Sequence, residues 1–199
     1  MNVSREELAK WVEGSYEIAL AHGFHDKVLS VPRMLMLIFT EVSEVVEADR
    51  KRLRANLSKF DIELSKDNTD DGFEWSFGIY IKDSVEDELA DVIIRICDTC
   101  ATLDIPPHIV GGAEEDFRNI FGSDTLCEKC FYLCQILGRI DETLLEGFGD
   151  DSDSVEHGLG SALTFVLCMC EDMGIDIKRH VELKMHYNEL RPAKHGKAY

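Results

Sequence analysis

Amphipathic segments that follow helix-capping residues constrain the fold of this chain more than any other feature. Ser4-x-x-Glu7 forms a capping box ahead of a segment that runs to about residue 22. Pro32 stands where the first turn of the next helix accepts proline, and Ser84-x-x-Asp87 opens another helical segment. Apolar residues at helical spacing predict further helices at about 124–146, 154–173 and 175–190. The sequence therefore predicts an all-α helical bundle.

One stretch, residues 59–83, breaks the helical pattern. FDIEL and FGIYI alternate apolar and polar residues on either side of the turn-forming sequence KDNTDDG. Such alternation is typical of a strand with one buried face, so the stretch predicts a small β-hairpin or an irregular lid.

The charge balance excludes several kinds of partner. The 39 acidic side chains outnumber the 21 basic ones, which gives a formal net charge of −18. So acidic a chain repels a nucleic-acid backbone or an anionic membrane surface unless a bound cation intervenes. We find no apolar run near the roughly 18 residues of a membrane span and no signal-peptide core. We therefore expect a cytoplasmic protein that binds neither nucleic acid nor membranes.

The seven cysteines raise the question of disulfide bonds or a zinc site. Several of them lie in apolar helical runs, which fits reduced thiols better than a disulfide framework. Cys97-x-x-Cys100 and Cys127-x-x-Cys130 have the spacing of a four-cysteine zinc site. The first pair lies in the middle of a predicted helix, without the turn that positions zinc ligands, so core packing is the favoured interpretation.

Two pairs of acidic residues carry the strongest functional signal. Glu41-x-x-Glu44 and Glu88-x-x-Asp91 each place two carboxylates one turn apart, on helical faces rich in valine, isoleucine and leucine. Burial of carboxylates among such residues is costly unless a cation neutralises them. If the two helices pack antiparallel, the four carboxylates converge, and all-oxygen ligation favours Mg²⁺, Mn²⁺ or Ca²⁺ over Zn²⁺. A solvated helix face explains either pair alone, but both pairs together favour the metal site.

The second half of the chain contains a similar pattern. Residues 83–105 and 153–175 align without gaps and share Asp-Ser-Val-Glu followed by matching Leu, Cys and Ile positions. The preceding helices, 36–49 and 130–143, also align, but at a larger offset in the sequence. The difference between the two offsets is about the length of the stretch 59–83. We interpret this pattern as an internal duplication, although shared caps and apolar periodicity explain part of the match.

The second repeat lacks the acidic residues. In the alignment Glu41 stands opposite Gln135, Glu44 opposite Gly138, Glu88 opposite Gly158 and Asp91 opposite Ser161. We therefore expect a single all-α domain over 1–199, with a metal-binding repeat at 1–110 and a degenerate repeat plus C-terminal helix at 111–199. The two repeats would pack as an intrachain pseudo-dimer around one metal centre.

Three segments resemble a known family. MLIFTEVSEVVEADRKR, IKDSVEDELADVIIRICD and GIDIKRHVELKMHYNELRPAKHGK look like the MazG-like all-α nucleoside triphosphate pyrophosphohydrolases. Together with GFHD at 23–26, they cover about half of the chain. The resemblance implies Mg²⁺-dependent hydrolysis, with Mn²⁺ as an alternative ion, of a nucleoside or deoxynucleoside triphosphate to a monophosphate and pyrophosphate.

The resemblance also implies roles for individual residues. Glu41, Glu44, Glu88 and Asp91 match the family's metal-binding and catalytic carboxylates, and Lys184-x-x-x-Asn188-x-x-Arg191 matches its phosphate-side motif. Trp75 is a further candidate, either stacking on the substrate's base or packing in the hairpin. Because residues 106–173 separate the two motifs, it is open whether the C-terminal one reaches the acidic site.

The sequence is compatible with two functions. One is the pyrophosphohydrolase, and the other is a catalytically idle helical module that binds a nucleotide or a protein partner. The intact carboxylate quartet favours the enzyme. A homodimer is compatible with the sequence, which does not specify the oligomeric state.

Overall fold

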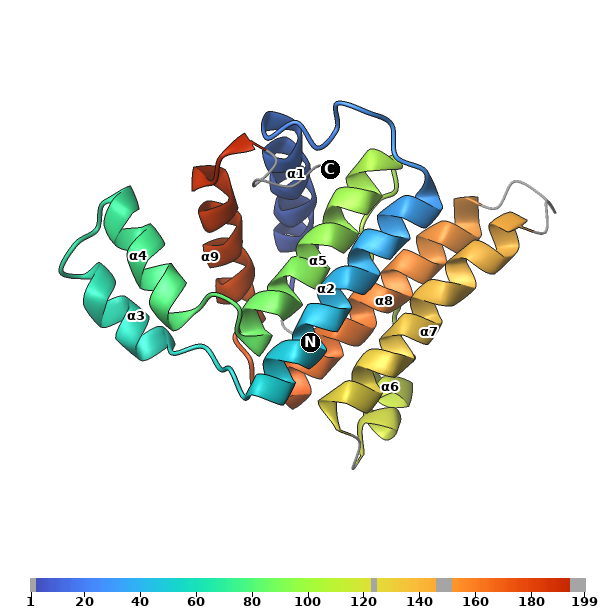
Figure 1. Ribbon diagram of the computed structural model, residues 1–199. Helices are drawn as coiled ribbons and strands as arrows, with labels where there is room; N and C mark the ends of the chain where they lie inside the picture. The colour runs from blue at the N-terminus through green and yellow to red at the C-terminus, as the bar shows by residue number, and fades with distance from the viewer. Residues whose placement is uncertain (1–2, 123–124, 146–151, 194–199) are drawn as a thin grey trace.

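The computed structural model describes residues 3–122, 125–145 and 152–193, and every regular element in these ranges is a helix (Figure 1). In chain order they are α1 (Arg5–Ala21), α2 (Val31–Lys51), α3 (Leu57–Leu64), α4 (Asp70–Tyr80), α5 (Val85–Thr102), α6 (Ala113–Phe121), α7 (Leu126–Leu145), α8 (Ser152–Asp172) and α9 (Ile177–Leu190). The all-α prediction is confirmed. Within the described ranges, we find no single helix that has both the length and the apolarity to cross a membrane.

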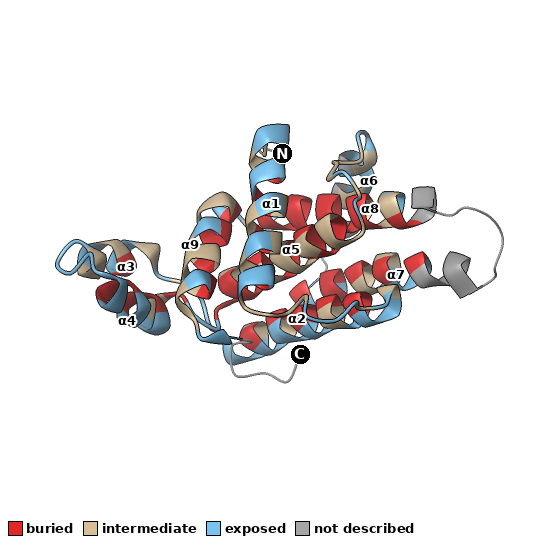
Figure 2. Cartoon of the chain, turned by 90° about the horizontal axis from the view of Figure 1, so that it is seen from above, coloured by how far each residue is buried: buried red, intermediate tan, exposed pale blue. Residues whose placement is uncertain are grey.

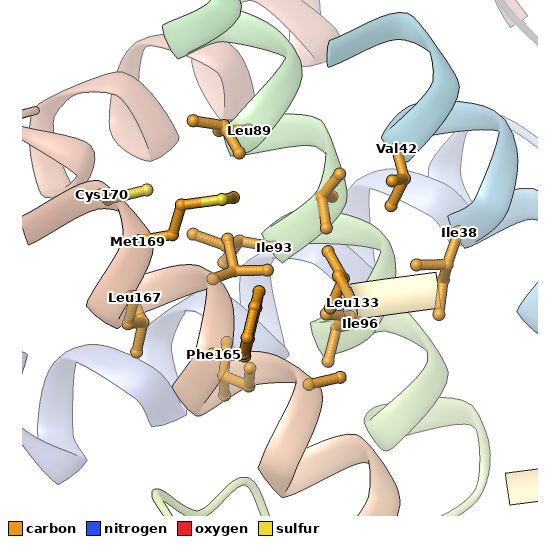
Figure 3. Close-up of a cluster of buried hydrophobic side chains, with 14 of the residues drawn as sticks. Ile38, Val42, Leu89, Ile93, Ile96, Leu133, Phe165, Leu167, Met169 and Cys170 are labelled. Carbon is orange, nitrogen blue, oxygen red and sulfur yellow. The ribbon is translucent and has the colours of Figure 1, made fainter. Parts of the chain in front are cut away.

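Four long helices form the main bundle. α2 packs against α5, α7 packs against α8, and the two pairs join through contacts of α2 with α7 and of α5 with α8. The buried sides of these helices face one another in Figure 2. The core between them includes Ile38 of α2, Ile93 of α5, Leu133 of α7 and Phe165 of α8 (Figure 3). α1 and α9 flank α5, and α6 covers α8.

Local capping explains where several helices begin and end. The side chain of Ser4 accepts a hydrogen bond from the Glu7 N–H and completes the predicted capping box, and Ser84 caps α5. α5 and α8 end in the same way. Asp104 and Gly174 adopt left-handed backbone, with φ of 56° and 68°, and the N–H of the next isoleucine donates to the carbonyl five residues earlier.

The predicted hairpin at 59–83 is wrong, because α3 and α4 occupy this stretch. The alternating pattern hides pairs spaced by four residues: Phe77 and Ile81 are buried, whereas Ile79 between them is 60% exposed. Asn56 and Thr69 each accept a backbone hydrogen bond from the first turn of the helix that follows them. These caps, together with the buried i, i+4 pairs, favour helices over strands.

α3 and α4 form an arm beside the bundle, and α9 lies between the arm and α5 (Figure 1). Phe60, Phe73, Phe77 and Ile81 make a second apolar core with residues of α9. The ring of Phe77 stacks on Tyr187 with centroids 4.4 Å apart. α9 therefore has one face on the arm and another on the bundle.

A further helix, α6, lies just before the helix predicted at 124–146, in a stretch for which the sequence predicts no helix. It follows Gly112, whose φ of 85° is in the left-handed region that glycine tolerates best. The rings of Phe117 and Phe121 both pack edge-on against Phe165 of α8. This aromatic packing accounts for the helix, because the segment is too short to be stable alone.

Candidate metal centre

One pocket, with a volume of about 290 Å³, collects seven of the eight predicted site residues. Its lining includes Glu41 and Glu44 of α2, Glu88 and Asp91 of α5, Lys184 and Asn188 of α9, and Arg191, the C-cap of α9. α2 and α9 both pack against α5, which brings the acidic pairs and the C-terminal motif together across residues 106–173. The C-terminal motif therefore reaches the acidic site.

Three of the carboxylates are close enough to share one cation. Oxygen atoms of Glu41, Glu88 and Asp91 all lie within 4.8 Å of one another, a spacing compatible with metal–oxygen distances of about 2.0–2.6 Å. Glu41 and Glu88 are buried, and Asp91 is half-buried. Glu44 lines the same pocket from a more exposed position and is not part of this triad.

Glu88 supplies the observation that fits a cation best. Its Oε2 atom is buried and has no hydrogen-bond partner among the described residues. A buried carboxylate oxygen without a partner costs free energy, and a divalent cation would remove that cost. An all-oxygen donor set of this kind suits Mg²⁺ or Mn²⁺.

Two basic side chains already contact the acidic wall. Lys184 Nζ lies 2.8 Å from Asp87 Oδ2 and 2.6 Å from Asp91 Oδ2, and Lys184 is only 5% exposed. Arg95 Nε donates to Glu41 Oε1 at 3.1 Å. These contacts offset part of the negative charge and hold the carboxylates in place.

The pKa values show that the nearby cations do not fully compensate the buried negative charge of the acidic wall. Burial, reinforced by Asp91, raises the pKa of Glu88 to about 8 despite the opposing effect of Lys184. Burial also raises the pKa of Glu41 and raises that of Asp87 to about 6. Burial alone would lower the pKa of Lys184, but Asp91 and Asp87 outweigh it and raise that pKa. The pocket is thus poised to accept additional positive charge.

Sequence reasoning missed Asp87 and Arg95. Asp87 was assigned to the helix cap, but its Oδ2 accepts the Asp83 N–H at 3.0 Å in addition to the Lys184 ammonium. A usable signal was its position one turn before Asp91, on the same helical face. Arg95 lies one turn after Asp91, within the apolar run VIIRIC of α5. A cation among apolar residues is stable only with an acidic partner, which was the usable signal.

Trp75 is the predicted site residue that the fold does not bring to the pocket. It lies on the outer face of α4, 55% exposed, with its ring edge-on to Tyr80. Its neighbours Phe73 and Phe77 point to the opposite side of the helix, into the core of the arm. A hairpin would have placed these alternate residues on one face, whereas the helix separates Trp75 from the other two.

Three of the four cysteines in the two motifs pack in the bundle, whereas Cys127 is exposed. Cys97, Cys100 and Cys130 are buried, and burial raises the pKa of Cys100 and of Cys130 to about 12. Thiols with so high a pKa are poor metal ligands, because ligation needs the thiolate. No cluster of cysteines suited to a metal ion occurs in the parts of the chain that the structure describes.

The fold and the pocket define an all-α protein with a pocket in which three carboxylates have the spacing of cation ligands. Carboxylates occupy one wall, while Lys184, Asn188 and Arg191 approach from α9 and the turn after it. Such a combination suits a ligand that carries its own negative charge and binds together with the cation. In comparisons with protein-family models, curated proteins and solved structures, nothing matches this chain.

Proposed function

We propose that the protein hydrolyses a nucleoside or deoxynucleoside triphosphate to the monophosphate and pyrophosphate in the presence of Mg²⁺. The observation that carries this proposal is the meeting of two charge types in one pocket. Carboxylates of α2 and α5 face Lys184 and Arg191, a pairing suited to a polyanion that binds with its metal. The resemblance of the same residues to the MazG-like family supports the reaction type.

Each group in the pocket has a role in this proposal. Glu41, Glu88 and Asp91 would hold Mg²⁺, with Glu44 nearby at the more exposed edge. Mg²⁺, when bound, supplies positive charge to phosphate oxygens and lowers the pKa of a coordinated water. Lys184 would act as a fixed point charge close to the acidic wall, whereas Arg191 offers a planar fork for phosphate oxygens.

A panel of nucleoside and deoxynucleoside triphosphates tests the proposal. Pyrophosphate release would be measured for each compound with and without Mg²⁺. Release that requires Mg²⁺ and yields the matching monophosphate supports the enzyme. Nucleotide binding with no turnover across the whole panel would instead favour the idle module.

The binding of Mg²⁺ should depend on pH. The pKa of Glu88 lies at about 8, above its ordinary value of 4.5, so below pH 8 a proton competes with the cation. We expect the apparent affinity to rise with pH between 6 and 8, by up to about tenfold per pH unit. Calorimetric titration with Mg²⁺ at pH 6, 7 and 8 measures this change, and an affinity that stays constant contradicts the assignment.

The same shift affects the stability of the metal-free chain. Between pH 4.5 and 8 the folded state holds a proton on Glu88 that the unfolded state releases. The free energy of unfolding should therefore fall as the pH rises through this window, as far as Glu88 alone is concerned. Added Mg²⁺ should reduce this loss.

We also infer that the bundle is a degenerate tandem repeat whose halves pack as an intrachain pseudo-dimer. The α2–α5 pair would correspond to the α7–α8 pair. The matching turns at Asp104 and Gly174, at equivalent places in the aligned segments, support this correspondence. At the position of Glu88 the second repeat has Gly158, and a Cβ placed there would lie 2.4 Å from Ile140 Cγ1. Packing of Ile140 thus fills the space of the lost carboxylate.

Substitution of Gly158 probes that replacement. We expect Gly158→Ala to destabilise the chain by about 1–3 kcal/mol, because Ile140 must move to admit the methyl group. Gly138→Ala is the matched control, since a Cβ at Gly138 meets nothing within 4 Å and alanine is the better helix former. Thermal unfolding of both variants provides the measurement, and equal stability of the two would contradict the packing argument.

A further inference from the structure

A second acidic triad lies beside the first and shares one residue with it. Oxygen atoms of Asp83, Asp87 and Glu88 are all within 4.8 Å of one another, as are those of Glu41, Glu88 and Asp91. Glu88 is therefore common to both groups. A carboxylate has two oxygens, so one side chain can bridge two cations, and paired cations in such centres lie about 3.5–4 Å apart.

The second triad also contains buried oxygens that lack partners. Asp87 is 1% exposed and Glu88 is 5% exposed. Asp87 Oδ1 and Glu88 Oε2 have no hydrogen-bond partner among the described residues. Lys184 and the Asp83 N–H both bind Asp87 through its other oxygen, Oδ2, and leave Oδ1 unsatisfied. Asp87 Oδ1 is the unsatisfied oxygen that belongs to the second triad alone, and a cation held there would satisfy it.

Charge balance points the same way. Six carboxyl side chains line the pocket and Asp87 lies beside Glu88, whereas Lys82, Arg95, Lys184 and Arg191 are the cationic side chains of the lining. If all are ionised, negative charge exceeds positive charge by three. One divalent cation leaves the pocket negative, but a second makes it positive. The second state attracts a polyanion such as a triphosphate more strongly than the first.

We propose that Asp83, Asp87 and Glu88 form a second divalent-cation site, bridged by Glu88 to the site of Glu41 and Asp91. This inference rests on the proposed function, because the first cation belongs to it. Lys82 competes weakly for the new site, since its 2.6 Å ion pair with Asp83 is exposed to solvent. Asp83 is the accessible ligand, with a side chain 65% exposed, and gives the second cation a route from solvent.

Counting bound Mn²⁺ on the full chain tests the proposal. Mn²⁺ replaces Mg²⁺ at oxygen sites, and the free ion is measured directly by electron paramagnetic resonance. We expect two Mn²⁺ per wild-type chain, one in Asp83→Asn and one in Glu41→Gln. Asparagine tolerates the left-handed backbone of Asp83, where φ is 60°, so the substitution preserves the turn. Asp71→Asn, at an exposed acid of α4 outside both triads, should still bind two.

The outcomes separate this inference from the proposed function. One Mn²⁺ in both the wild type and Asp83→Asn overturns the second site and leaves the first intact. Two Mn²⁺ in Asp83→Asn show that the ligands are assigned wrongly. No Mn²⁺ bound to the wild type overturns the metal centre altogether, and the proposed function with it.

Discussion

The Glu88→Gln variant should release pyrophosphate at least about a hundred times more slowly than the wild type. Loss of residues that only support metal ligands costs about 10–100-fold, and Glu88 belongs to the ligand triad itself. Glutamine keeps the shape of the side chain but removes its charge. Because burial already penalises that charge, the metal-free variant should also melt at a higher temperature than the wild type.

Glu47→Gln is the matched control. Glu47 lies on α2 one turn after Glu44, but it forms exposed ion pairs with Arg50 and Lys51 and is not part of the pocket lining. Its substitution should change neither turnover nor stability appreciably. Near-normal turnover in Glu88→Gln would eliminate the proposed metal centre as the site of the reaction.

The Lys184→Met variant should lose about 3–5 kcal/mol of stability at neutral pH. Methionine fills much of the same buried volume, but it leaves Asp87 and Asp91 facing each other without their common cation. The loss should shrink toward pH 5, because Asp87 can then take up a proton. Mg²⁺ should restore part of the stability, since a divalent ion replaces the missing positive charge.

Lys178→Met on the same helix separates this effect from the loss of an ordinary lysine. Lys178 pairs with Glu7 at 2.8 Å in a partly exposed position, so its removal should cost less than about 1 kcal/mol. Chemical denaturation at pH 5 and pH 7.5, with and without Mg²⁺, measures all of these differences. Equal stability of the two variants would show that Lys184 does not neutralise the acidic wall.

The acidic wall was predictable because local spacing determines which residues share a helical face. Glu88 and Asp91 are three residues apart on a capped helix, so their convergence needed only the packing of α2 against α5. The ion pairs of Lys184 were not predictable in this way. Its contact with Asp87 spans 97 residues, and no periodicity within either segment specifies which turn of α9 meets which turn of α5.

The arm shows the opposite failure, in which a local pattern was misleading. Apolar residues at every second position are compatible with a strand that buries one face. They are equally compatible with a helix in which only every second one of them, four residues apart, is buried. Phe77 and Ile81 are buried while Ile79 is exposed, a distinction that depends on the presence of α9 as a packing partner. Thr69 was the better guide, because a capping residue followed by Asp70 and Asp71 favours a helix start.

The place of Lys184 in the chain has a consequence for synthesis on the ribosome. The carboxylates of α2 and α5 are synthesised long before α9. Asp87 and Asp91 therefore lack the Lys184 ammonium while the intervening helices are made. Until then, burying the first turns of α5 would bring like charges together without compensation. We therefore expect the acidic end of α5 to be the last part of the bundle to close, unless Mg²⁺ occupies it first.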